Sequence, residues 1–222
     1  RFDKRKAVGI LQIGIPSAFQ YSLFAFANLF VQSSVNSFDH VLVEGNSAAA
    51  NADPLVYDMM AAFYTACSSF IAQNFGARKK KRILQTYLIC LFYSFITSLV
   101  LGVGIYLARY PFLYLFTSDK AVVEAGITRL SIMALSYSAS AFMDASIAAS
   151  RGLGKTAVPT FVVVMGSCVF RIIWIYTIFA YFHTIQSLYI LYVFSWGITA
   201  IAENIYFFHV YRHTLTEKKE LC

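Results

Sequence analysis

Six long apolar stretches follow one another along this chain, and short polar segments separate them. They cover residues 9–37, 55–75, 83–107, 126–150, 157–182 and 188–211. Each is as long as the roughly 20 residues that a helix needs to cross a bilayer. None shows the alternation of apolar and polar residues that marks a membrane-spanning β-strand. The pattern therefore predicts an all-α membrane protein, with six transmembrane helices over residues 9–211.

The composition excludes the soluble classes of protein. Hydrophobic residues make up 59% of the 222 residues and charged residues 13%, against about 45–50% and 25% in soluble domains. Gly154, Lys155 and Thr156 look like the end of a phosphate-binding loop, but Ala149 stands where that motif needs a glycine. The sequence contains no other catalytic motif and no paired-cysteine metal motif. We therefore expect neither an enzyme nor a metal site.

The basic residues predict an orientation in the membrane. Fourteen of the 18 Lys and Arg residues lie in segments 1–8, 76–82, 151–156 and 212–222, which alternate with acidic segments. Basic residues concentrate in cytoplasmic loops, so we expect both termini in the cytoplasm. Residues 1–8 then form a cytoplasmic linker and residues 212–222 a cytoplasmic tail. The net charge of +7 accordingly indicates membrane topology, and we expect no nucleic-acid partner.

Two of the predicted outer loops carry a pattern of their own. Segment 38–54 is rich in small and acidic residues, and we expect it to be partly helical and to continue the first span. Segment 108–125 has aromatic residues at alternate positions from Tyr110 to Phe116, which suits the aromatic belt at a membrane interface. Ser118 or Asp119 could cap the helix that follows.

Ionisable residues inside the apolar stretches are costly in lipid, so they are the first candidates for function. Asp144 lies about two turns before Arg151, and a carboxylate at that depth can bind a proton or Na⁺. The alternative is an acid that pairs with Lys155 or with another basic residue. Arg171 and Glu203 lie deep in the last two stretches, where they either pair with each other or line a hydrated cavity.

Uncharged polar residues on the first stretch form a second group of candidates. They include Gln20, Asn28, Gln32 and Asn36. The first three are separated by multiples of four residues, which places them on one face of a helix, where they either bond to neighbouring helices or contact a ligand. Asp58 and Arg129 lie near the outer ends of their spans, and we expect both side chains to snorkel to the interface.

Several phrases of the sequence resemble the C-terminal half of the multidrug and toxic compound extrusion (MATE) family. They are GIPSAFQ at 14–20, QSSVNSF at 32–38, GNSAAAN at 45–51, IAQNFGARKKKR at 71–82 and FMDASIAASRGLGKTAVP at 142–159. The residues to which the resemblance gives a structural role are Gly14, Pro16, Gln73, Asn74, Gly76, Arg151, Gly152 and Pro159. Phe24 and Ser140 stand where one branch of the family has acids, so the C-terminal ion site of that branch is not reproduced.

The resemblance implies one lobe of a two-lobe transporter, with this chain as helices seven to twelve. The implied function is export of amphipathic, often cationic drugs in exchange for Na⁺ or H⁺, with no cofactor beyond that ion. The implied partners are a drug-like substrate, the missing N-terminal lobe and the lipid bilayer of a bacterial plasma membrane. Two alternatives stay open: a lipid-linked saccharide flippase of the same superfamily, and a truncated membrane fragment that does not transport.

Overall fold

A computed structural model describes residues 4–213, and this part of the chain folds into helices without any β-strand. Six helical spans are long and apolar enough to cross a membrane. They run over Ala7–Val35, His40–Gly76, Lys80–Leu107, Lys120–Gly152, Ala157–Phe182 and Ile185–His213. The predicted all-α fold with six candidate membrane helices is therefore confirmed.

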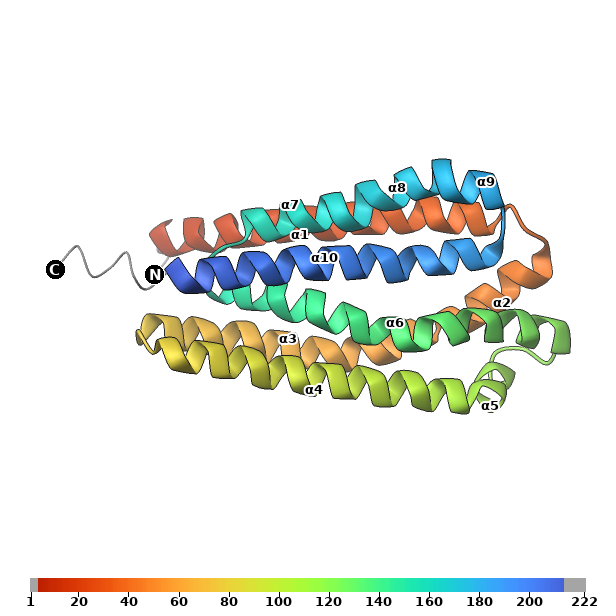
Figure 1. The fold of residues 1–222 in the computed structure, drawn as a ribbon, viewed down its shortest axis with the longest axis horizontal. Helices are drawn as coiled ribbons and strands as arrows, with labels where there is room; N and C mark the ends of the chain where they lie inside the picture. Colours follow the sequence, from red (N-terminus) through yellow and green to blue (C-terminus); the bar gives the residue numbers. More distant parts are fainter. Residues whose placement is uncertain (1–3, 214–222) are drawn as a thin grey trace.

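The six spans divide into a longer series of elements. In chain order these are α1 (Lys4–Val35), α2 (His40–Ala50), α3 (Ala52–Gly76), α4 (Lys80–Leu107), α5 (Arg109–Tyr114), α6 (Lys120–Gly152), α7 (Ala157–Val163), η1 (Val164–Val169), α8 (Phe170–Trp174), η2 (Ile175–Phe179), α9 (Ala180–Phe182) and α10 (Ile185–His213). The beginning of α1 and the end of α10 lie at the same end of the bundle (Figure 1). Which side of the membrane that end faces stays a prediction. Residues 1–3 and 214–222 of the predicted linker and tail lie outside the described residues.

The structure corrects the expectation for segment 38–54. That segment does form a helix, α2, but it does not continue the first span, because α1 ends at Val35 and a turn follows. Asp39 caps α2 by accepting a hydrogen bond from the backbone N–H of Leu42 at 2.9 Å. At its other end Asn51 keeps right-handed helical angles, so α2 runs on into α3. The segment therefore belongs to the second span.

The connection between α4 and α6 carries the predicted aromatic residues. It contains the short helix α5, from which Tyr110 and Tyr114 expose 42% and 46% of their surface, and Phe116 follows with 48%. Amphipathic rings of this kind suit the level of the lipid headgroups. Asp119, one of the two predicted caps, accepts a hydrogen bond from the backbone N–H of Ala121 at 2.8 Å and begins α6.

Helix α6 forms the centre of the bundle. In its most apolar window 72% of the residues are buried, against 12% for the first span and 22% for α4. Figure 1 shows α6 and α10 between α3 and α4 on one side and α1 with α7–α9 on the other. The small residues Ala141, Ala145, Ala148 and Ala149 of α6 belong to the two core clusters. Short side chains let the neighbouring backbones approach α6 closely.

The fifth span departs from regular α-helical geometry. Two π-helical turns, η1 and η2, interrupt its α-helical geometry, and such turns free backbone groups from the regular ladder. Within η1, the Cβ of any larger residue at Gly166 would overlap the Thr199 hydroxyl of α10. The span ends at His183, which adopts the left-handed conformation with φ of 46°. The short turn after it leads directly into α10.

Two glycines of α4 lie in opposite environments. A Cβ added at Gly102 would overlap the backbone carbonyl oxygen of Ala134 on α6, whereas a Cβ at Gly104 would meet nothing within 4 Å. Gly102 is therefore needed where α4 and α6 touch, and Gly104 is not.

We predict that Gly102→Leu destabilises the bundle by about 1–3 kcal/mol, because the added side chain forces α4 away from α6. Gly104→Leu is the matched control and should leave stability unchanged or raise it slightly, since leucine favours helix over glycine. Thermal unfolding of the purified protein in detergent measures both. Equal melting temperatures for the two variants would contradict the close contact between α4 and α6.

Candidate functional site

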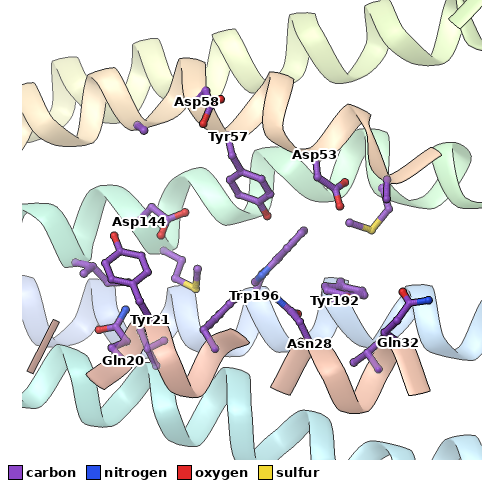
Figure 2. A pocket seen from close by; sticks show the side chains of 18 of the residues that line it. Gln20, Tyr21, Asn28, Gln32, Asp53, Tyr57, Asp58, Asp144, Tyr192 and Trp196 are labelled. Atoms are coloured by element: carbon purple, nitrogen blue, oxygen red, sulfur yellow. The ribbon is translucent and has the colours of Figure 1, made fainter. Parts of the chain in front are cut away.

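A cavity of about 690 Å³ lies between α1 and the rest of the bundle. Helix α1 forms one wall, and α3, α6 and α10 form the opposite wall (Figure 2). The polar residues that line it are Gln20, Asn28, Gln32, Asn46, Asp53, Asp58, Arg129, Asp144 and Arg151, and the aromatic ones are Tyr21, Phe24, Tyr57, Tyr64, Tyr189, Tyr192 and Trp196. This mixture suits a ligand with both apolar and charged parts.

The polar stripe of α1 supplies one wall of the cavity. Gln20, Asn28 and Gln32 point into it (Figure 2), as their spacing on one helical face requires. Asn36 does not line the cavity, because it lies in the turn after α1, where its Oδ1 accepts a hydrogen bond from Gln32 Nε2 at 3.0 Å. The stripe therefore serves both roles that the sequence allows, since its members bond to protein groups while facing the cavity.

A charged network closes the α2 end of the cavity. Arg129 donates to Asn46 Oδ1 at 2.6 Å and pairs with Asp53 at 2.5 Å. Tyr137 donates its hydroxyl hydrogen to the other Asp53 oxygen at 2.5 Å. The expectation that Arg129 snorkels to the interface is wrong, because only 6% of this residue is exposed. Asp58, the other residue expected to snorkel, is exposed and lines the cavity.

Arg171 lies fully buried behind the cavity wall. Its guanidinium donates to Asn28 Oδ1 at 2.6 Å and to Ser195 Oγ at 3.3 Å. The rings of Phe24 and Tyr192 lie 4.6 and 4.5 Å from its central carbon, which is cation–π distance. The structural pair that the sequence suggested with Glu203 is not formed, because neither Glu203 oxygen has a hydrogen-bond partner among the described residues. Arg171 does not line the cavity either.

Asp144 lies in the cavity wall toward the end of the bundle that holds both chain ends (Figures 1 and 2). Arg151 lies two helical turns further along α6 and is the nearby base whose charge acts on the Asp144 carboxylate, but Asp144 forms no ion pair with Arg151 or Lys155 in the described part of the chain. Arg151 also donates to Gln20 Oε1 at 3.0 Å, which connects α6 to the stripe of α1. The Tyr64 hydroxyl lies beside the Asp144 carboxyl, although no hydrogen bond of good geometry joins them.

The residues taken from the family motifs occupy helix ends and tight contacts. Gly152 lies where α6 crosses α3, and a Cβ there would come within 2.7 Å of the Ser68 carbonyl oxygen. Asn74 donates to the Phe70 carbonyl at 2.8 Å, near the end of α3. Pro16 lies inside α1, and Pro159 is buried in α7.

The remaining motif residues face open space or solvent. Gly14 and Gly76 would each accept a Cβ without meeting any atom within 4 Å, and Gln73 is exposed in the last turn of α3. Their place in the motif has no packing explanation in the described part of the chain.

Sequence reasoning missed Asp53, Asn46 and the aromatic wall of the cavity. Asp53 lies at the start of α3, in a segment that the sequence assigns to a loop. Asp53 meets Arg129 because α3 packs against α6 with the Asp53 side chain facing that arginine. The spacing of residues along the chain gives no signal of this contact. Tyr57, Tyr192 and Trp196 sit among many other aromatic residues, so nothing in the pattern separates them from lipid-facing rings.

We predict that Arg129→Met lowers the free energy of unfolding by about 1–3 kcal/mol, because it leaves the Asp53 carboxylate without its charged partner. The double variant Asp53→Asn with Arg129→Met should recover part of that loss. Arg109→Met, which removes a half-buried arginine that bonds to the Tyr106 carbonyl and has no carboxylate partner among the described residues, is the control. Thermal unfolding in detergent checks the series, and an equal loss for both arginine variants would contradict the network.

A family model described as MatE matches residues 16–177 of this chain. A comparison with curated protein sequences finds no match. Solved structures do match, and the chain spans about half of their length, since it covers 44–49% of the chains that are similar to it.

Three of these structures are described as straight, outward-facing and bent forms. A crystal structure of MATE in the straight conformation is 18% identical, with a TM-score of 0.88 over 98% of this chain and 49% of that one. An outward-facing multidrug resistance MATE transporter of the MOP superfamily is 19% identical, with a TM-score of 0.86 over 97% and 49%. The Vibrio cholerae transporter VcmN in its bent form is 18% identical, with a TM-score of 0.84 over 95% and 48%. At these identities the likeness shows the fold.

Proposed function

Because the chain belongs to the MatE family, we propose that it forms one lobe of a transporter that exports amphipathic organic cations in exchange for Na⁺ or H⁺. The proposed setting is the plasma membrane of a bacterium, and the proposed partner is a second lobe that completes the central cavity. The observation that supports this function best is the cavity between α1 and α3, α6 and α10, because its lining combines aromatic rings with an excess of acids over bases.

The lining favours a cationic ligand over an anionic one. Three aspartates and two arginines are the charged residues of the cavity, so the acids exceed the bases. The charge of Arg129 is compensated by Asp53, which leaves Asp58 and Asp144 with Arg151 as the remaining base of the lining. One negative charge of the lining is therefore available to a ligand. Tyr57, Tyr192 and Trp196 offer ring faces to a planar cation, which is the arrangement that cation–π contact requires.

Asp144 is the residue we propose for coupling. It faces the cavity, so a bound organic cation and a coupling ion would compete for the same negative charge. Such competition is the elementary requirement for exchange, because one cation has to leave before the other is bound. Alternating access would come from bending of the helices around this site, and Pro16 in α1 and the π-helical turns of the fifth span are suitable points for it. The solved relatives are described in straight, bent and outward-facing forms.

The flippase alternative finds less support in the cavity. A lipid-linked saccharide carries a pyrophosphate, which calls for a cationic lining. Arg171 would be the natural contact, but it is fully buried and bonded to Asn28 and Ser195 behind Phe24 and Tyr192. The excess of acids in the lining would repel the pyrophosphate. The assays below distinguish the proposal from the remaining alternative, which is a fragment that does not transport.

Tryptophan fluorescence offers a direct test of ligand binding, because the chain has only two tryptophans. Trp196 lines the cavity, whereas Trp174 packs behind it and donates to the Ser187 carbonyl. We predict that tetraphenylphosphonium changes the fluorescence of the Trp174→Phe variant, in which Trp196 remains. The Trp196→Phe variant should respond little. A response confined to the Trp196→Phe variant would place the ligand elsewhere and contradict the proposed cavity.

Transport tests the role of Asp144. We predict that Asp144→Asn in the protein encoded by the complete gene abolishes ion-dependent ethidium efflux from cells that lack their own exporters, because the coupling charge is gone. Glu124→Gln, which alters an exposed acid that accepts from the Tyr110 hydroxyl, is the control and should leave efflux unchanged. Efflux of Asp144→Asn with unaltered dependence on pH and Na⁺ would remove Asp144 from the site.

A further inference from the structure

Glu203 is a buried acid that the cavity does not explain. It lies in the middle of α10 with none of its surface exposed, and it is absent from the cavity lining. Neither of its carboxylate oxygens has a hydrogen-bond partner in the part of the chain that the structure describes. An ionised carboxylate without partners in a membrane interior is very costly, so this group requires a counter-charge.

The charges around Glu203 do not balance by themselves. Arg151 of α6 acts on both Glu203 and Asp144, and the two acids repel each other. Tyr206 on the same helix also faces Glu203, while Tyr57 and Tyr64 of α3 face Asp144. Two carboxyl groups therefore share one guanidinium among the described charged groups. The cluster keeps one negative charge unless it takes up a further monovalent cation.

Helix contacts hold the two acids at this level of the bundle. Asn204, next to Glu203, donates to the Phe142 carbonyl of α6 at 3.3 Å. The same side chain accepts from the Tyr87 hydroxyl at 2.6 Å, and that hydroxyl lies 3.0 Å from Ser146 Oγ. Phe142 and Ser146 stand two residues before and after Asp144. These bonds join α10 to α6 and α4 at the level of Glu203 and Asp144.

A hydroxyl group without a partner of its own lies beside Asp144. Tyr64 of α3 carries this buried hydroxyl, which has no hydrogen-bond partner among the described residues. A hydroxyl group both donates and accepts hydrogen bonds, so Tyr64 suits the transfer of a proton to and from Asp144 at the cavity wall.

We propose that Glu203 and Asp144 form a two-carboxylate proton site, in which Asp144 exchanges a proton with the cavity and Glu203 holds it inside the protein. When the proton is bound, one carboxyl group is neutral and Arg151 balances the other. When it leaves through Asp144, the cluster carries one negative charge that an organic cation in the cavity can compensate. The site itself follows from the geometry, whereas its coupling to export rests on the proposed function.

Infrared spectroscopy tests the site without any transport substrate. A pH step applied to the purified chain in lipid should produce a C=O stretching band of a protonated carboxylic acid, and Glu203→Gln should remove that band or reduce it to the contribution of Asp144. Glu203→Asp should keep the band with a shifted pH midpoint, and Glu124→Gln should leave it as in the wild type. Circular dichroism and melting temperature establish that each variant is folded.

Two outcomes would overturn the proton site. The first is a band whose intensity and pH midpoint are unchanged in Glu203→Gln. The second is loss of the wild-type band when Na⁺ is added at constant pH, since the site would then take Na⁺ in place of a proton.

Substrate binding gives a separate measure of the coupling. If one proton leaves when the organic cation binds, the Kd of tetraphenylphosphonium should rise by up to about tenfold for each pH unit of acidification. Glu203→Gln should flatten that slope, and an unaltered slope would overturn the role of Glu203. A band that depends on Glu203 without any cation binding would refute the proposed function alone. Cation binding without such a band would refute the proton site alone.

Discussion

The structure depends on one constraint, which is that a charged side chain in a membrane interior is costly unless a group of opposite charge or a hydrogen-bond partner accompanies it. Helix α6 carries Arg129, Asp144 and Arg151 through the centre of the bundle, and the neighbouring helices are arranged around these three charges. Asp53 and Asn46 meet Arg129 at one end, and Gln20 meets Arg151 at the other. The small residues of α6 allow the helices that supply these partners to approach closely.

The same constraint accounts for the position of the cavity. Helix α1 buries few of its own residues and turns its polar stripe toward α6, so polar groups from both helices face one another across a space. Large apolar side chains of α1 such as Ile15, Phe26 and Phe30 are exposed. Exposed apolar side chains of this kind suit contact with lipid or with a second lobe. A cavity wall with aromatic rings and available acids results directly from this arrangement, and the proposed export of organic cations builds on it.

The sequence was sufficient for the six helices, because lipid demands long apolar stretches whatever the details of packing. It also narrowed the cap of α6 to Ser118 or Asp119, of which the structure uses Asp119. It was insufficient where partners come from distant helices. The pairing of Arg129 with Asp53 depends on how α3 packs against α6, and Arg171 bonds to Asn28 and Ser195 in place of Glu203. The join between α2 and α3 was missed because small residues suit a loop as well as a packed helix.

The central claim is that a ligand-accessible cavity separates α1 from the rest of the lobe. Ala61 and Ala62 are adjacent exposed alanines of α3, but Ala61 lines the cavity and Ala62 does not. With the native cysteines replaced by alanine, a cysteine introduced at position 61 should react with a water-soluble thiol reagent, and tetraphenylphosphonium should slow that reaction. A cysteine at position 62 should show no such protection. Equal behaviour of the two positions would contradict the cavity and the function proposed for it.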